Sequence, residues 1–273
     1  MTTKSSNDTS FFGHPGGLQT LFFTEMWERM SYYGMRALLV LFMTASLQEE
    51  GLAFTVASAT AIYGLYTGAV YFMGLPGGWI ADRLLGGQKA VWYGGVIIMC
   101  GHIVLAIPSH STFFIGLILV VLGTGLLKPN ISAMVGQLYD DKDSRRDSGY
   151  TIYYMGINIG SLIGYGVCGW LAPNWGYHYA FGAAAIGMLI GLIQYRATLP
   201  KLEGASEEPT TSMSVKARKR SWSVIALFLI GLAGVTAATS MGVLIIDPVA
   251  LAAYVAMAFT LIFIIYFGAI FFF

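Results

Sequence analysis

Long apolar segments separated by short polar ones make up most of the chain. A helix needs about 20 mostly apolar residues to cross the hydrocarbon core of a bilayer, and the pattern predicts eight such spans. Their expected ranges are 18–45, 56–80, 90–107, 112–138, 149–171, 179–197, 222–244 and 250–272. The segments lack the alternation over about ten residues that is typical of membrane β-barrel strands. The pattern therefore predicts an all-α polytopic membrane protein.

The composition of the 273-residue chain agrees with this interpretation. Hydrophobic residues make up 56% of it, charged residues 11%, and the mean hydropathy is +0.67. Soluble proteins carry about 25% charged residues, so a soluble enzyme and a disordered chain are excluded. A net charge of +1 offers no basic field for nucleic acid. The two cysteines, Cys100 and Cys168, lie within apolar runs and indicate neither a disulfide framework nor a metal cluster.

The positions of lysine and arginine predict the orientation of the chain. Twelve of the 15 basic residues lie in the N-terminal tail, in the segments that follow the second, fourth and sixth spans, or in the last turn of the sixth span. The loops on the opposite side contain none; these are 46–55, 108–111, 172–178 and 245–249. Because cytoplasmic loops carry the excess of lysine and arginine, we expect the N-terminus to be cytoplasmic.

The domain organisation follows from the same segments. We expect a cytoplasmic tail at 1–17, a six-helix bundle at 18–198, a cytoplasmic linker at 199–221 and an additional pair of transmembrane helices at 222–273. The linker is rich in Pro, Glu, Thr, Ser and Lys. Because the sequence stops at Phe273 within an apolar run, we expect this chain to be part of a longer polypeptide.

Apart from Arg196 in the last turn of the sixth span, five charged residues lie inside the predicted spans: Glu25, Glu28, Arg29, Arg36 and Lys128. A charge at the bilayer centre costs about 2.5–3.5 kcal/mol, so these residues are expected to face a partner or a water-filled cavity. On the first span, Glu25, Arg29 and Arg36 share one helical face with Tyr32. Two carboxylates beside a permanently charged arginine form a proton-sensitive unit. The alternative is a salt bridge that only locks helix packing.

Lys128 lies about sixteen residues into the fourth span, near mid-depth in the membrane. Pro129 follows it and removes a backbone donor from the helix. Arg36 and Lys128 would offer a positive surface to an anionic substrate group, and a guanidinium can hold a carboxylate with two hydrogen bonds. Snorkelling of the lysine to the interface is the alternative.

Polar residues also occur on the second, third and fifth spans. On the fifth span, Asn158 shares a face with Tyr154 and Ser161, and we expect Asn158 to line a cavity and Ser161 to make an interhelical hydrogen bond. The second span offers Tyr71. His102, alone in an apolar helix, is interpreted as a packing residue with satisfied hydrogen bonds.

A charge pair, Asp82 and Arg83, lies at the cytoplasmic end of the second span beside Gly86. Such a pair can latch helix ends in one conformation and release them in another. The alternative is that Arg83 only marks the topology.

Four motifs resemble the proton-dependent oligopeptide transporter family of the major facilitator superfamily. They are Glu25-x-x-Glu28-Arg29 followed by Tyr32-Tyr33-Gly34, the segment Gly77 to Gly86, Leu127-Lys128-Pro129-Asn130, and the segment Tyr153 to Ser161. The resemblance covers about residues 18–197 and implies two six-helix bundles that alternate access to a central cavity. Bacterial members insert two helices between the bundles, which matches the last two spans. The second bundle is missing from this chain.

The resemblance also implies roles for individual residues. Proton coupling would involve Glu25, Glu28 and Arg29. Peptide binding would involve Arg36, Lys128, Tyr32, Tyr33, Tyr71 and Asn158, with the two cations receiving the carboxyl end of the peptide. The resemblance implies no cofactor apart from the coupling proton.

We therefore expect the N-terminal half of a proton-coupled symporter of di- and tripeptides in the inner membrane of a bacterium. Its expected partners are these peptides, membrane lipid and the C-terminal six-helix bundle of the same polypeptide, but no nucleic acid. Two alternatives remain open: a transporter of another anion, such as nitrate or a carboxylate, and a truncated fragment that does not transport. The sequence lacks the HExxH and GxSxG motifs that an intramembrane enzyme would carry.

Overall fold

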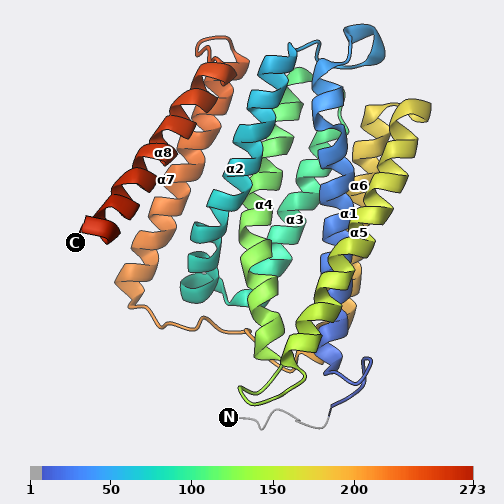
Figure 1. Cartoon of the computed structure of the whole chain (residues 1–273), viewed down its shortest axis with the longest axis vertical. Coiled ribbons are helices and arrows are strands. Elements are labelled where there is room, and N and C mark those ends of the chain that lie inside the picture. The colour runs from blue at the N-terminus through green and yellow to red at the C-terminus, as the bar shows by residue number, and fades with distance from the viewer. Residues whose placement is uncertain (1–7, 273) are drawn as a thin grey trace.

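Eight long helices make up the part of the chain that the structure describes, as the sequence predicts (Figure 1). The computed structural model describes residues 8–272. The helices are α1 (Gly16–Thr44), α2 (Val56–Ile80), α3 (Gly87–Leu105), α4 (His110–Gln137), α5 (Arg146–Trp175), α6 (Tyr177–Thr198), α7 (Val215–Ser240) and α8 (Pro248–Phe272). Seven of them are long and apolar enough to cross a membrane. The remaining helix, α1, carries four charged residues, but its 29 residues span roughly 43 Å, which exceeds the bilayer core. The chain is thus an all-helical multi-pass membrane protein.

Helix α1 packs chiefly on α5 and α6. Three glycines on α5, Gly156, Gly160 and Gly164, bring the two backbones close together, because a Cβ at each would meet the backbone of α1. At Gly160 the added atom would collide with the carbonyl oxygen of Met26. Small residues are the usual means by which membrane helices approach each other, and here they fix α1 against α5.

Helices α2, α3 and α4 form the neighbouring part of the bundle, in which α4 lies between α2 and α3. Gly77 of α2 lies directly against Gly125 of α4, and Gly94 of α3 lies against Gly123 of α4. Helix α3 also packs on α6, so the six helices close into one unit. By contrast, the backbone of α1 makes only limited contact with α2 and α4. The interface combines apolar packing, such as Phe42 of α1 against Phe113 of α4, with an ion pair.

The pair α7 and α8 lies beside α2 and α4, away from α1, α5 and α6 (Figure 1). Their apolar spans bury no residue against the rest of the described chain. Helix α7 begins at Val215, so its first residues lie within the segment 199–221 that we expect to be a cytoplasmic linker. The Ser214 side chain accepts a hydrogen bond from the Ala217 N–H at 3.2 Å, and the lysines and arginines that follow are good helix formers.

The connection between α6 and α7 crosses the end of the bundle at which α1 begins (Figure 1). Two hydrogen bonds attach its backbone to this end of the bundle. The side-chain amide of Gln88 donates to the Ala205 carbonyl at 2.9 Å, and the Thr211 N–H donates to the Asp82 carbonyl at 3.0 Å. Just before α3, residues Ala81–Leu85 continue α2 as a π-helical turn. Gly86 ends this turn with φ of +80°, a conformation that favours glycine.

Candidate functional site

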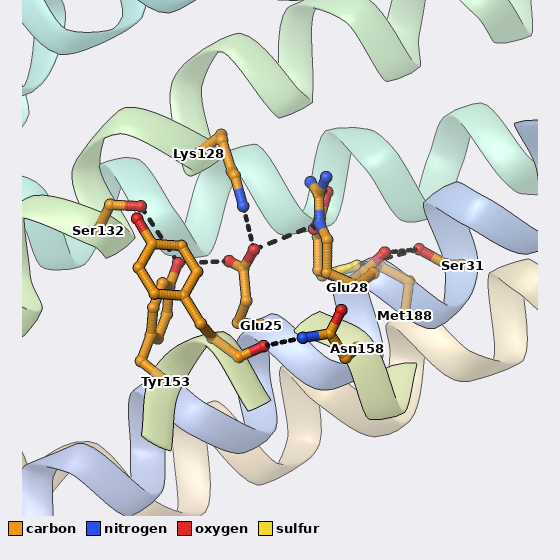
Figure 2. Close-up of polar contacts among 10 residues, drawn as sticks. Glu25, Glu28, Ser31, Lys128, Ser132, Tyr153, Asn158 and Met188 are labelled. Carbon is orange, nitrogen blue, oxygen red and sulfur yellow. Dashed lines mark hydrogen bonds and ion pairs between the residues drawn. The ribbon is translucent and has the colours of Figure 1, made fainter. Parts of the chain in front are cut away.

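A cluster of buried charges lies between α1, α4 and α5 (Figure 2). On α1, Glu25 and Glu28 are fully buried and Arg29 is 6% exposed. A charge this deep in a membrane protein requires a partner, and α4 supplies one through Lys128. The expectation that these charges turn inward agrees with this geometry, although α4 contributes the lysine from 103 residues further along the chain.

Glu25 is the centre of the cluster. Its Oε1 forms an ion pair with the Lys128 Nζ and lies 3.3 Å from the Arg29 Nε. Its Oε2 accepts a hydrogen bond from the Tyr153 hydroxyl at 2.7 Å. Three helices therefore hold one carboxylate, and both of its oxygens have partners.

Glu28 and Arg29 form a two-pronged ion pair, in which the Arg29 Nε and Nη2 donate to the two carboxylate oxygens. The same guanidinium lies over the Tyr32 ring, with its carbon 4.7 Å from the ring centre, a distance at which a cation and an aromatic ring attract each other. One arginine thus contacts both glutamates and a tyrosine. The salt bridge that we considered as a packing lock is present, but it is part of a larger network.

The four charges balance when all of them are ionised, because Glu25 and Glu28 offset Arg29 and Lys128. Removing one partner of a buried pair typically costs about 3–5 kcal/mol. Protonation of one glutamate would likewise leave excess positive charge in a site with little solvent screening. The arrangement can therefore couple the uptake of a proton to the binding of an anion.

Lys128 is the most exposed member of the cluster, with 34% of its side chain accessible. Pro129 follows it within α4, and because proline has no backbone N–H, one hydrogen bond of the helix is missing there. The next residue, Asn130, donates from its amide to the Leu126 carbonyl at 2.6 Å and to the Gly77 carbonyl of α2 at 3.3 Å. The Lys-Pro-Asn sequence thus places the ammonium and also ties α4 to α2.

Arg36 lies seven positions beyond Arg29 on α1, roughly 10 Å further along the helix. Its Nε donates to the Tyr63 hydroxyl of α2 at 2.6 Å, and its guanidinium carbon lies 5.9 Å from the centre of the Tyr32 ring. Arg36 is half-buried and has no carboxylate partner among the residues that the structure describes. It therefore keeps an uncompensated positive charge.

The other residues that we expected at a peptide site differ in their exposure. Tyr32 is buried, Tyr33 is half-buried, and Tyr71 of α2 is 76% exposed. Asn158 of α5 is exposed, and its amide donates to the carbonyl of Tyr154 on the same helix at 3.1 Å (Figure 2). The structure therefore places Tyr32 within the charged cluster but leaves Tyr71 and Asn158 on the surface of this chain.

Asp82 and Arg83 lie apart from the cluster, in the π-helical turn at the end of α2. Both side chains are exposed, and neither forms an ion pair within residues 8–272. The Asp82 carbonyl accepts hydrogen bonds from Thr211 and Thr210, so the following linker already contacts this turn. Their role as a latch stays a prediction.

Three residues of the network were missing from the candidates drawn from the sequence: Tyr153, Ser132 and Tyr63. Ser132 follows Lys128 by one helical turn, a spacing that places both on one face. Tyr153 lies on the α5 face marked by Gly156 and Gly160, which packs on α1. That glycine stripe was the available signal, and it distinguishes buried Tyr153 from Tyr154, which is 57% exposed.

His102 on α3 corrects another expectation. It is fully buried, as a packing residue would be, but neither ring nitrogen has a hydrogen-bond partner among the described residues. The hydroxyls of Tyr66, Thr67 and Thr124 are likewise buried without a protein partner. Within the same residues, no group of three His, Cys, Asp or Glu side chains could hold a metal ion.

A bundle of membrane helices around a buried, charge-balanced cluster is typical of membrane transport proteins. Comparison with known proteins agrees. The family model described as the POT family (PTR2) matches residues 88–202. The uncharacterized transporter YclF of Bacillus subtilis is 51% identical over 199 residues, which are 72% of this chain and 40% of that protein.

Two further relatives carry names that describe a solute. The peptide transporter YePEPT of Yersinia enterocolitica is 40% identical over 97% of this chain and 54% of that protein. A di-/tripeptide transporter of Lactococcus lactis is 46% identical over 80% of this chain and 45% of that protein. The chain spans about half the length of the curated relatives that it matches.

Solved structures show the same relationship. A peptide transporter POT in complex with sulfate is 42% identical and superposes with a TM-score of 0.86 over 95% of this chain and 53% of that one. A POT family transporter in complex with 5-aminolevulinic acid is 36% identical, with a TM-score of 0.84 over 91% of this chain and 52% of that one. The chain belongs to the POT family. The matched family and relatives are transporters rather than enzymes, in agreement with the expectation from the sequence.

Proposed function

We propose that this chain is the N-terminal half of a symporter that carries di- and tripeptides together with protons. The observation that carries the proposal is the Glu25 carboxylate, which is held at once by Lys128, Arg29 and Tyr153 from three helices. A charge-balanced site of this kind responds to a single added proton. The names of the relatives supply the class of solute.

Coupling would follow from the charge balance of the cluster. When Glu25 or Glu28 takes up a proton, the two cations Arg29 and Lys128 face a single remaining carboxylate. The excess positive charge then favours an anion brought in by the solute, because charges interact strongly where water is scarce. The carboxyl end of a peptide is such an anion, so proton and peptide would bind together and leave together.

The peptide site would extend from the cluster along α1. Arg36 would receive the carboxyl end because it has no carboxylate partner among the described residues. Lys128 would join it once protonation of Glu25 opens their ion pair. The remaining contacts would come from Tyr32, Tyr33, Tyr71 and Asn158. The exposure of Tyr71 and Asn158 supports a site that is completed by the second six-helix bundle of the same polypeptide.

In this proposal the N-terminus lies in the cytoplasm of a bacterium and the helices lie in its inner membrane. The basic residues at the end where α1 begins support this orientation. The turn that contains Asp82 and Arg83 lies at the same end, where it would latch the two bundles in one of the two conformations.

A test uses the Glu25→Gln variant of the transporter polypeptide that contains this chain, reconstituted in liposomes. We expect loss of peptide uptake driven by a pH gradient, because the cluster can no longer take up and release a proton at this position. Exchange of labelled for unlabelled peptide at equal pH, which needs no net proton movement, should persist. Uphill uptake at the wild-type rate would contradict the proton coupling.

A second candidate is transport of another anionic solute, such as nitrate or a carboxylate. The relative solved with 5-aminolevulinic acid favours keeping it open, since that ligand carries a carboxyl group but is not a peptide. Competition between labelled dipeptide and unlabelled anions distinguishes the two candidates. Peptide transport predicts displacement by dipeptides and none by nitrate or simple carboxylates at equal concentration.

A further inference from the structure

Hydroxyl groups lead away from Glu25 towards the end of the bundle at which α1 begins. The Tyr153 hydroxyl donates to the Glu25 Oε2 at 2.7 Å, and the same hydroxyl lies 3.2 Å from the Ser132 Oγ (Figure 2). The three side chains come from α1, α5 and α4. They form a continuous hydrogen-bonded path across the interface between these helices.

The path advances in one direction along the bundle. Glu25 follows the first residue of α1 by nine positions, Tyr153 follows the first residue of α5 by seven, and Ser132 precedes the last residue of α4 by five. These three helix ends lie at the same end of the bundle (Figure 1). At 1.5 Å per residue, the groups lie roughly 14, 10 and 8 Å from it. Each step therefore moves closer to the proposed cytoplasmic surface.

The exposure of the side chains changes along the path in the same direction. Glu25 and Tyr153 are fully buried, whereas Ser132 is partly exposed. The neighbouring positions on α4, Leu127 and Ile131, are apolar and fully buried. A proton on Glu25 therefore has a hydrogen-bonded exit through Tyr153 and Ser132, and the Tyr150 hydroxyl lies near its outer end, 3.4 Å from the Ser132 carbonyl oxygen.

Resting on the proposed symport function, we propose that Tyr153 and Ser132 relay the coupling proton from Glu25 to water on the cytoplasmic side. The protonated carboxyl of Glu25 gives its proton to the Tyr153 oxygen while the Tyr153 proton passes to the Ser132 oxygen. The Ser132 proton passes to a water molecule. Three O–H bonds break and three form, which leaves a carboxylate, two intact hydroxyls and a hydronium ion.

The observed hydrogen bonds match the state after release. Tyr153 donates to Glu25, which is the orientation that the relay leaves behind. Lys128 from α4 and Arg29 from α1 both contact the Glu25 carboxylate and favour its ionised form, while the charge of Glu28 opposes them. The two adjacent cations thus supply the driving force for handing the proton to Tyr153.

The alternative role for Tyr153 is to hold Glu25 in position. Variants of Ser132 distinguish this structural role from a proton relay. Ser132 does not contact Glu25, so only a relay predicts that Ser132→Ala has the same effect as Tyr153→Phe. Ser132→Thr keeps a hydroxyl at the same place and serves as the conservative rescue. Tyr179→Phe on α6, where the tyrosine is exposed, is the matched control for loss of a phenol.

The experiment compares two assays of the full transporter polypeptide in liposomes: dialanine uptake driven by a pH gradient, and dialanine exchange at equal pH. We expect Tyr153→Phe and Ser132→Ala each to slow driven uptake about tenfold or more, the order expected for loss of a proton-transfer group. Exchange should continue at the wild-type rate. Ser132→Thr should restore driven uptake, and Tyr179→Phe should alter neither assay.

Two results would overturn the relay: driven uptake at the wild-type rate in Ser132→Ala, or equal losses of driven uptake and exchange in Tyr153→Phe. The second would assign Tyr153 a structural role. Failure of the proposed function has a different signature, because the wild-type transporter would then move no dialanine in either assay.

Discussion

The Lys128 ammonium of α4 forms an ion pair with the Glu25 carboxylate of α1. This contact joins two helices whose backbones make few contacts, and it crosses the interface next to which we place the peptide site. The carboxylate is fully buried and the lysine side chain is partly exposed. The pair is therefore positioned to open when the acid is protonated, with the lysine released towards the solute.

Replacing Lys128 by alanine tests the structural weight of this pair. We expect a loss of about 3 kcal/mol in the free energy of unfolding, since a buried carboxylate is left with one cation fewer. Lys128→Arg should retain most of the stability, and the double variant Glu25→Gln with Lys128→Ala should regain part of it. Denaturant unfolding in mixed micelles measures all three, and an unchanged single variant would contradict the pair.

The close contact of α1 with α5 predicts a sharp difference between two glycines of the same helix. Gly160→Ala should destabilise the protein by about 1–3 kcal/mol, because the new methyl group would meet the rigid Met26 carbonyl. Gly169→Ala is the control: its Cβ would meet no other atom within 4 Å, and alanine is the better helix former. Thermal unfolding should show a lower midpoint for the first variant only.

Tyr63 is expected to support Arg36. Hydrogen bonds to charged groups contribute about 1.5–3 kcal/mol, so Tyr63→Phe should weaken dipeptide binding by roughly tenfold if Arg36 receives the carboxyl end. Tyr93→Phe, at an exposed position of α3, is the control. Equilibrium binding of dialanine measures the effect. Equal affinities for the wild type and Tyr63→Phe would contradict the proposal that the Tyr63–Arg36 hydrogen bond supports dipeptide binding.

A pH-dependent contact occurs outside the membrane, just before α1. His14 is buried and its Nδ1 lies 2.9 Å from the Tyr139 hydroxyl. Burial lowers the pKa of His14, and the nearby Arg145 lowers it further, while Asp143 acts in the opposite direction. A lowered pKa in the folded state means that this contact is at full strength above the ordinary histidine pKa of about 6.5 and weakens as the pH falls.

Hydrogen exchange of the amides at residues 8–18 measures this contact. We expect faster exchange as the pH falls below about 6.5, after correction for the intrinsic pH dependence. His14→Gln cannot be protonated in this range, so its corrected rates should not depend on pH. The same acid-induced increase in the glutamine variant would assign the effect to another group.

The spans were predictable because the thickness of the bilayer imposes long apolar runs, and the helix bounds differ from the expected ones by only a few residues at most ends. The start of α7 differs more, since Lys216 and its basic neighbours form helix outside the apolar run. Hydropathy predicts only the part of a helix that lies in the membrane. A helix that continues beyond the membrane leaves no trace in the hydropathy.

The inward direction of Glu25 and Glu28 was also predictable, because lipid would make their charges costly. Their partners were less so. The sequence places Lys128 at a suitable depth but does not state which residue it meets on α1. On α5, the regular spacing of polar residues favours the face that contains Asn158, and not Tyr153, as the lining of a cavity. In the structure, Gly160 packs against Met26, so the opposite choice holds: the face of α5 that contains Tyr153 turns towards α1.

The pH dependence of dipeptide affinity in the wild type and in Glu25→Gln tests the central claim most directly. The account predicts that wild-type affinity rises as the pH falls, because protonation of Glu25 frees Lys128. Glu25→Gln, which is neutral at every pH, should bind dialanine tightly without any dependence on pH, and adding Lys128→Ala should abolish the gain. A Glu25→Gln variant that keeps the wild-type pH dependence would contradict the account.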